Sequence, residues 1–216
     1  MKNKPTKRSL TTIIGLLLLL FGIGTLSYSY GPLLYAETRY QIKQVAYNPT
    51  LGQHDTSSNV QSSGTVEPVA ITLVDTDFGI VIPKIDANAP IVANVDPYDS
   101  TAYQQALAHG VAQAEGSGVP TDSKTMFLFA HASGDLLMAR RYNSIFYLLN
   151  KMATDDEITI YYHNLPYTYQ VTQVKTVAPD AVNYLENTPD TDLILMTCTP
   201  PGTTWKRLLV FAKLLK

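Results

Sequence analysis

The sequence has little cysteine and little charge. Cys198 is the only cysteine among 216 residues, so no intramolecular disulfide can form and the fold must depend on packing. One cysteine cannot build a structural zinc site, and the four histidines lack metal-ligand spacing, so we expect no metal and no cofactor. Charged residues make up 16% of the chain; four of the sixteen basic ones fall in the first eight residues, leaving twelve basic against eighteen acidic residues for the rest. Nucleic acid is therefore not expected as a partner.

One long apolar run follows the basic start. No charged residue lies between Arg8 and Glu37. At about 1.5 Å per residue, residues 10–34 can cross a hydrocarbon core of about 30 Å, and the basic residues before them favour a cytoplasmic tail over residues 1–9. The alternative, a cleavable signal peptide, usually has a shorter apolar region and a clearer small-x-small site. We expect an uncleaved, single-pass anchor in the cell membrane, with the rest of the chain extracellular.

The remainder divides by composition into a linker and one domain. Residues 35–77 are polar, small and rich in turn formers, as in a tether. Within residues 78–216, short apolar runs separated by turn signals predict strands over residues 79–85, 91–95, 125–130, 157–162, 167–174, 193–198 and 207–214. Short helices are predicted over residues 101–108, capped by Ser100, and over residues 143–152. Strands outnumber helices without βαβ alternation, so the fold class is mostly β: a closed, mainly antiparallel barrel.

The last two predicted strands carry two candidate reactive residues. The first ends on Cys198, a Pro-Pro-Gly turn follows, and the second opens at Arg207. If the strands pair antiparallel, the thiol and the guanidinium become neighbours. His131 closes another apolar strand, and a single cysteine, a separate histidine and a nearby arginine suit thiol-based acyl transfer. A lone cysteine in a strand is more often buried and inert, so a non-catalytic, membrane-tethered β-barrel binding domain is the alternative.

Residues 78–216 resemble the sortases, membrane-anchored cysteine transpeptidases of bacterial surfaces. Residues 194–198, Ile-Leu-Met-Thr-Cys, are similar to the family's Thr-Leu-x-Thr-Cys signature, and Arg207 stands where its arginine opens the next strand. Residues 129–133 occupy the place of its histidine segment, with alanine on both sides of the histidine, and residues 80–85 look like its first barrel strand. The Thr-Cys-Thr-Pro stretch and the short spacing from cysteine to arginine look closest to class D or E sortases.

The resemblance implies a reaction and roles for residues. A sortase cleaves a sorting signal of the Leu-Pro-x-Thr-Gly type between Thr and Gly, through a thioacyl-enzyme. It then transfers the surface protein to an amine acceptor, a cell-wall precursor or a pilin lysine. Cys198 would be the nucleophile, His131 the general acid and then base, and Arg207 the group that holds a substrate carbonyl or the oxyanion. The candidate substrate-binding residues are Thr197, Trp205 and Ala130.

Two other classes of cysteine enzyme fit less well. An L,D-transpeptidase is expected to carry a His-Gly-Cys-like cluster at its nucleophile, and none precedes Cys198. A papain-like protease places its cysteine before its histidine, the reverse of the order here.

The other histidines and an acidic turn are expected to have no catalytic role. His109 is expected at a helix end, favoured by the dipole, and His54 and His163 in solvent. Acidic residues 154–157 could bind calcium, as in some sortases, but a solvated turn is the expected interpretation.

Overall fold

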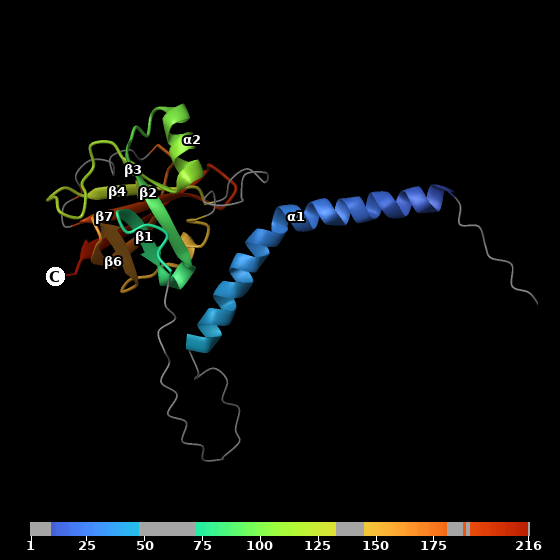
Figure 1. The fold of residues 1–216 in the computed structure, drawn as a ribbon, viewed down its shortest axis with the longest axis horizontal. Helices are drawn as coiled ribbons and strands as arrows, with labels where there is room; N and C mark the ends of the chain where they lie inside the picture. The colour runs from blue at the N-terminus through green and yellow to red at the C-terminus, as the bar shows by residue number, and fades with distance from the viewer. Residues whose placement is uncertain (1–9, 48–71, 133–144, 181–187, 189–190, 216) are drawn as a thin grey trace, which may run out of the picture.

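A closed β-barrel forms the main body, and a long helix precedes it (Figure 1). The computed structural model describes residues 10–47, 72–132, 145–180, 188 and 191–215. With η for a 3-10 helix, the elements in chain order are α1 (Leu10–Tyr47), β1 (Phe78–Ile82), η2 (Pro83–Ile85), β2 (Ala87–Val95), α2 (Ser100–His109), β3 (Val111–Ala114), β4 (Met126–Phe129), η3 (Leu149–Lys151), β5 (Glu157–Tyr162), β6 (Leu165–Val177), β7 (Leu193–Thr199) and β8 (Lys206–Leu214).

The barrel closes in the strand order β1-β2-β3-β4-β7-β8-β6-β5. Within the described residues, the pairs β2–β3 and β4–β7 are parallel and the other six are antiparallel. The predicted fold class, a mostly β, closed and mainly antiparallel barrel, is therefore confirmed. Closure removes free sheet edges and surrounds the core with hydrogen-bonded strands.

The apolar core lies inside this barrel, and the strands that carry the candidate site are among its most buried parts. All four residues of β4 are buried, as are the first three of β7. Burying a large aliphatic or aromatic side chain contributes about 1.5–3 kcal/mol, so these strands are held firmly. Only their carboxyl ends reach partly exposed positions, Cys198 and His131 among them.

Several details differ from the sequence prediction. The strand predicted over residues 79–85 ends at Ile82, and residues 83–85 form η2, because Pro83 has no N–H to donate to a neighbouring strand. The helix predicted over residues 143–152 is wrong where the structure describes it, since residues 145–148 form turns and η3 follows. Phe146 and Leu148 are both buried, whereas an α-helix would set their side chains about 200° apart. The cap of α2 is Asp99 rather than Ser100, and its carboxylate accepts from the backbone N–H of Thr101 and Ala102. β3 was not predicted, since its sequence, Val-Ala-Gln-Ala, has weak strand propensity.

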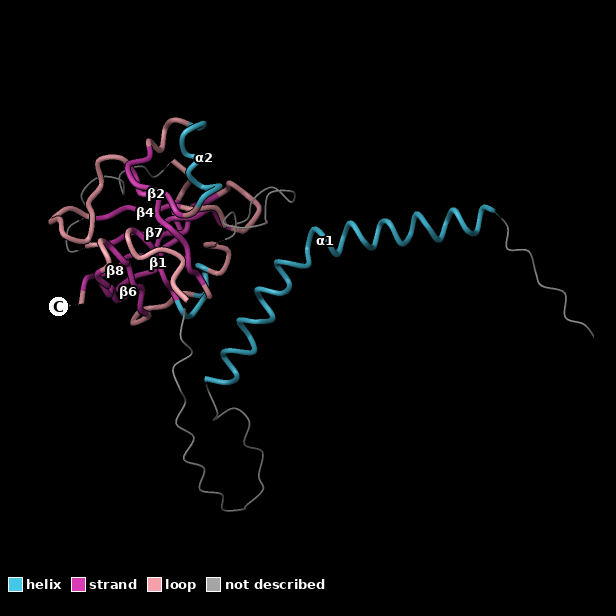
Figure 2. The backbone as a smooth tube through the Cα atoms, in the orientation of Figure 1, coloured by secondary structure: helices cyan, strands magenta, loops and turns pink. Residues whose placement is uncertain are grey.

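The long helix α1 contains the predicted membrane segment and continues to Tyr47, into the residues where the sequence predicts a linker. It changes direction along its length (Figure 2), and its sequence includes Pro32, which cannot supply a helical N–H. Near its end, Glu37 pairs with Lys151 at 2.9 Å and Arg39 pairs with Asp86 at 3.0 Å, so this part contacts the barrel. In the part of the chain that the structure describes, no helix combines the length and hydropathy needed to cross a membrane.

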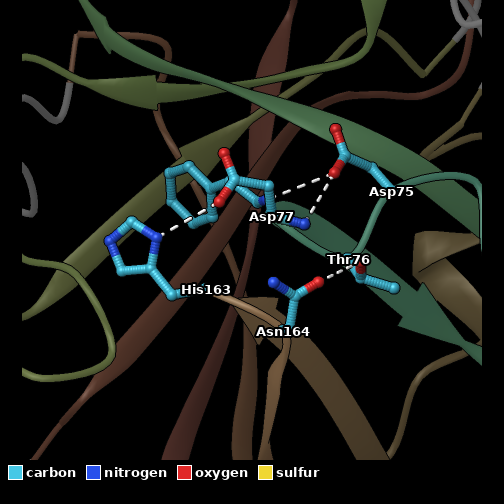
Figure 3. A network of polar contacts seen from close by, with 6 residues as sticks. Asp75, Thr76, Asp77, His163 and Asn164 are labelled. Atoms are coloured by element: carbon cyan, nitrogen blue, oxygen red, sulfur yellow. Dashed lines mark hydrogen bonds and ion pairs between the residues drawn. The ribbon is translucent and has the colours of Figure 1, made fainter.

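A polar network fixes the segment that leads into β1 (Figure 3). Asp77 accepts from His163 across 3.1 Å, and Thr76 donates to the side chain of Asn164 at 2.6 Å. His163 and Asn164 have φ values of 49° and 65° and form the tight turn of the β5–β6 hairpin. His163, predicted to be solvated, is exposed but has this acidic partner.

Candidate active site

Cys198 and Arg207 lie on neighbouring antiparallel strands. The register of β7 and β8 pairs Cys198 directly with Arg207, and Thr197 with Leu208. The short loop between the strands sets this register, so the proximity follows from local sequence. Cys198 is a free, half-buried cysteine. It is thus accessible enough to meet a substrate, and its partner on the neighbouring strand is a residue with a permanent positive charge.

The histidine reaches the same end of the barrel through a parallel pair. Phe129, the last residue of β4, pairs with Met196, and the N–H of Ala130 donates to the Met196 carbonyl at 3.1 Å. The same offset of 67 residues relates Ala130 to Thr197 and His131 to Cys198. The backbone register therefore brings His131 alongside Cys198, with Arg207 on the far side of β7.

Two of the predicted substrate-binding residues lie beneath this group. Thr197 and Ala130 are 3% and 6% exposed, and the Thr197 hydroxyl donates to the Ala130 carbonyl at 2.8 Å. This bond joins β7 to the chain just beyond β4. It fixes the backbone one residue before His131 and one residue before Cys198.

The imidazole of His131 contacts α2, a helix for which the sequence predicts no role in the site. Its Nε2 lies 3.3 Å from Oε1 of Gln104 on α2. Burial lowers the pKa of His131 below its ordinary value near 6.5. No sequence signal marked Gln104, because it is a neutral residue on an exposed helix surface and only the fold brings it to the histidine.

Arg207 is held by backbone carbonyls of the loop before β8 and of the first residue of β8. Its Nη1 donates to the Thr204 carbonyl at 3.1 Å and to the Lys206 carbonyl at 3.4 Å. Both contacts use one nitrogen, and the guanidinium fork also carries the N–H groups of Nη2 and Nε. Trp205, in the same loop, is 72% exposed. The structure thus places Trp205 on the surface beside the site, unlike the buried Thr197 and Ala130.

The remaining predicted candidates lie elsewhere. His109 is exposed in the last turn of α2, as predicted, and His54 lies outside the described residues. In the acidic turn over residues 154–157, Asp156 binds Lys84 through both carboxylate oxygens, at 2.9 and 2.7 Å, and accepts from the Ala153 N–H. Among the described residues, no group of three or more His, Cys, Asp or Glu side chains is arranged to hold a metal ion.

The closed barrel, with a thiol, an imidazole and a guanidinium brought together at one end, has the architecture of a cysteine transpeptidase. The chain belongs to the sortase family: the family model described as the sortase domain matches residues 80–215, well over half of the chain. A comparison with curated proteins finds no match.

Several solved sortases share the fold. Sortase A from Corynebacterium diphtheriae, in a lid mutant, is 27% identical with a TM-score of 0.54, over 66% of this chain and 71% of that chain. Sortase C-1 from Actinomyces oris is 27% identical with a TM-score of 0.54, over 66% and 76% of the two chains. Sortase C1 of GBS pilus island 1 is 26% identical with a TM-score of 0.54, over 84% of each chain. The assignment to class D or E stays a prediction.

Proposed function

We propose that this protein cleaves a sorting signal of the Leu-Pro-x-Thr-Gly type between Thr and Gly and transfers the new acyl group to an amine. The observation that carries the proposal is the strand register that sets Cys198 opposite Arg207 and alongside His131. Membership of the sortase family supports the reaction class. The sorting motif and the amine acceptor are the parts proposed here.

Acylation begins at the thiol. The Cys198 thiolate attacks the threonine carbonyl carbon and forms the C–S bond, and the C–N bond to glycine breaks as the tetrahedral intermediate collapses. Protonated His131 donates its proton to the departing glycine amine. The products of this half-reaction are a thioester on Cys198, a free peptide amine and a neutral imidazole.

Arg207 stabilises the charge that develops during this step. The tetrahedral oxyanion needs fixed donors, and a guanidinium offers several N–H groups with a permanent charge. The backbone carbonyls of Thr204 and Lys206 hold one edge of the guanidinium. We assign the other edge to a substrate carbonyl or to the oxyanion.

Deacylation reverses the proton movement. Neutral His131 takes a proton from the incoming amine, whose nitrogen attacks the thioester carbonyl and releases the Cys198 thiolate. We propose a cell-wall precursor or a pilin lysine as the acceptor, and surface proteins with a C-terminal sorting signal as the donors. Trp205, exposed beside the site, is proposed to line the substrate groove.

The test is mass spectrometry of the full-length protein with a panel of Leu-Pro-x-Thr-Gly-like peptides and an amine acceptor. We expect a covalent acyl adduct on Cys198 and a new peptide–amine product. The matched control is Cys198→Ala, which should give neither. An unreactive Cys198 in the folded protein, with no adduct across the panel, would refute the proposal in favour of a tethered binding domain.

We also propose that the exposed apolar part of α1 attaches the protein to the cell membrane, with the barrel on its outer side. The support is that large apolar side chains of α1 are exposed: the six from Leu16 to Phe21 are 53–72% exposed. Contiguous exposed apolar surface marks a region that contacts an apolar partner. Recovery with membranes after alkaline carbonate extraction is expected; release into the soluble fraction would refute the attachment.

A further inference from the structure

We propose that Gln104 is a positioning residue for His131: its side-chain amide orients the imidazole with a proton on Nε2, so that Nδ1 is the nitrogen that exchanges protons with the reacting amine. The inference rests on the proposed function, in which His131 moves that proton. It assigns a role to α2, which carries none of the three reactive groups.

The helix that carries Gln104 is anchored at both ends. Asp99 caps its start, and at its end the Gly110 N–H donates to the Ala106 carbonyl at 3.1 Å. A Cβ at Gly110 would collide with the Pro90 carbonyl oxygen, so glycine permits the close approach of this end to β2. Ala106 and Leu107 are buried on the inner face. Gln104 therefore projects from a fixed support.

The backbone that carries His131 is fixed as well. Ala130, the residue before it, uses its N–H to bond Met196 and its carbonyl to accept from Thr197. The side chain then extends toward α2, where Nε2 lies 3.3 Å from Oε1 of Gln104. Two anchored elements thus meet through this side-chain contact.

With the amide oxygen of Gln104 turned toward the ring, this contact selects the tautomer. An amide oxygen can only accept a hydrogen bond, so the imidazole must be the donor at Nε2. A neutral imidazole has one N–H, and placing it at Nε2 leaves Nδ1 with a free lone pair. In deacylation Nδ1 of His131 takes the proton from the incoming amine, and in acylation the proton on Nδ1 passes to the leaving glycine amine. Nε2 keeps its proton throughout.

The contact also favours the charged imidazole that acylation requires. Burial lowers the pKa of His131, and a hydrogen bond donated to an amide oxygen opposes that effect because it stabilises the imidazolium more than the neutral ring. The titratable and charged groups brought to His131 by the neighbouring described strands are Cys198 on β7 and Arg207 on β8, whereas Gln104 on α2 is neutral. Loss of the Gln104 amide would therefore lower the pKa of His131 further, because this hydrogen bond would no longer oppose the effect of burial.

The experiment compares three variants of the full-length protein. Gln104→Met keeps the length of the side chain but removes the acceptor, and Gln104→Glu keeps an acceptor oxygen. Gln105→Met makes the same change at the next exposed position of α2 and is the matched control. Imidazole ¹⁵N NMR reports the tautomer and pKa of His131, identified by the signal that His131→Asn removes, and steady-state transfer kinetics are measured on the same samples.

For wild type and Gln105→Met we expect the Nε2–H tautomer and equal rates. Gln104→Met should lose the tautomer preference, lower the pKa of His131 further and reduce kcat about 10-fold or more with little change in KM. Gln104→Glu should retain the tautomer and raise the pKa. A tautomer and pKa in Gln104→Met that match wild type would overturn the inference. If Cys198 of the folded wild type is unreactive and forms no adduct with any peptide, the proposed function fails, while the NMR result still decides the role of Gln104.

Discussion

Thr197 offers a sharp test of how the two catalytic strands are joined. Its hydroxyl donates to the Ala130 carbonyl at 2.8 Å, and both residues are buried. Thr197→Val replaces the hydroxyl by a methyl group of similar size and keeps the β-branched shape suited to a strand. The Ala130 carbonyl then loses this donor in a place that water reaches poorly.

The expected cost follows from that burial. An unsatisfied buried acceptor costs about 1–3 kcal/mol, which for a domain of this size lowers Tm by about 4–10 °C. Thr197→Ser is the matched control, because it keeps the hydroxyl and removes one methyl group, for a cost of about 1 kcal/mol. The two variants differ chiefly in whether the bond to Ala130 survives.

Urea unfolding gives the free energy of each variant, and transfer kinetics well below both unfolding transitions give the catalytic consequence. We expect Thr197→Val to lose more activity than Thr197→Ser, because His131 and Cys198 each follow directly on the bonded residues. If valine and serine variants proved equally stable and equally active, the claim that this bond positions the two residues would be refuted.

Four further outcomes are expected. Cys198→Ala should abolish the acyl adduct while the barrel stays folded; residual turnover would reassign the nucleophile. Arg207→Lys keeps the charge but loses the fork, so kcat/KM should fall about 100-fold or more, and near-normal rates would reduce Arg207 to a packing role. Burial lowers the pKa of His131, so as pH falls the unfolded chain binds a proton at this histidine before the folded chain does. The free energy of unfolding should therefore decline as pH falls from about 6.5 through the folded pKa. Urea unfolding of His131→Gln at the same pH values should show a shallower decline. Asp156→Ala leaves the partly exposed Lys84 ammonium without its partner, which should cost about 1–2 kcal/mol in urea unfolding; no change would show that solvent replaces the ion pair.

The sequence was most informative where structure is local. The β7–β8 hairpin has a short loop and two apolar strands, so its register, and with it the pairing of Cys198 with Arg207, could be predicted. The β5–β6 hairpin was equally clear. The helix predicted over residues 143–152 was wrong in its described part. The hydrophobic periodicity suggested a helix, whereas Phe146 and Leu148 are both buried in the barrel core.

Contacts between distant segments could not be read in the same way. Sixty-seven residues separate His131 from Cys198, and composition does not reveal that β4 and β7 pair in parallel. The resemblance to sortases suggested the association of His131 with Cys198, whereas Gln104 had neither a motif nor a local signal. A polar residue on an exposed helix surface becomes informative only after the fold shows which group lies above it.

The topology of the barrel explains why the three groups meet where they do. Parallel neighbours end at the same edge of a sheet, so the residues that follow β4 and close β7 must emerge together. An antiparallel neighbour starts where its partner ends, so the first residues of β8 reach that same edge. A histidine after one strand, a cysteine at the end of the next and an arginine at the start of the third are thus required to converge, whatever lies in the loops between them. The strand order fixes where the three residues lie but not how their side chains are oriented. For His131 we assign that orientation to Gln104 of α2, a helix outside the sheet.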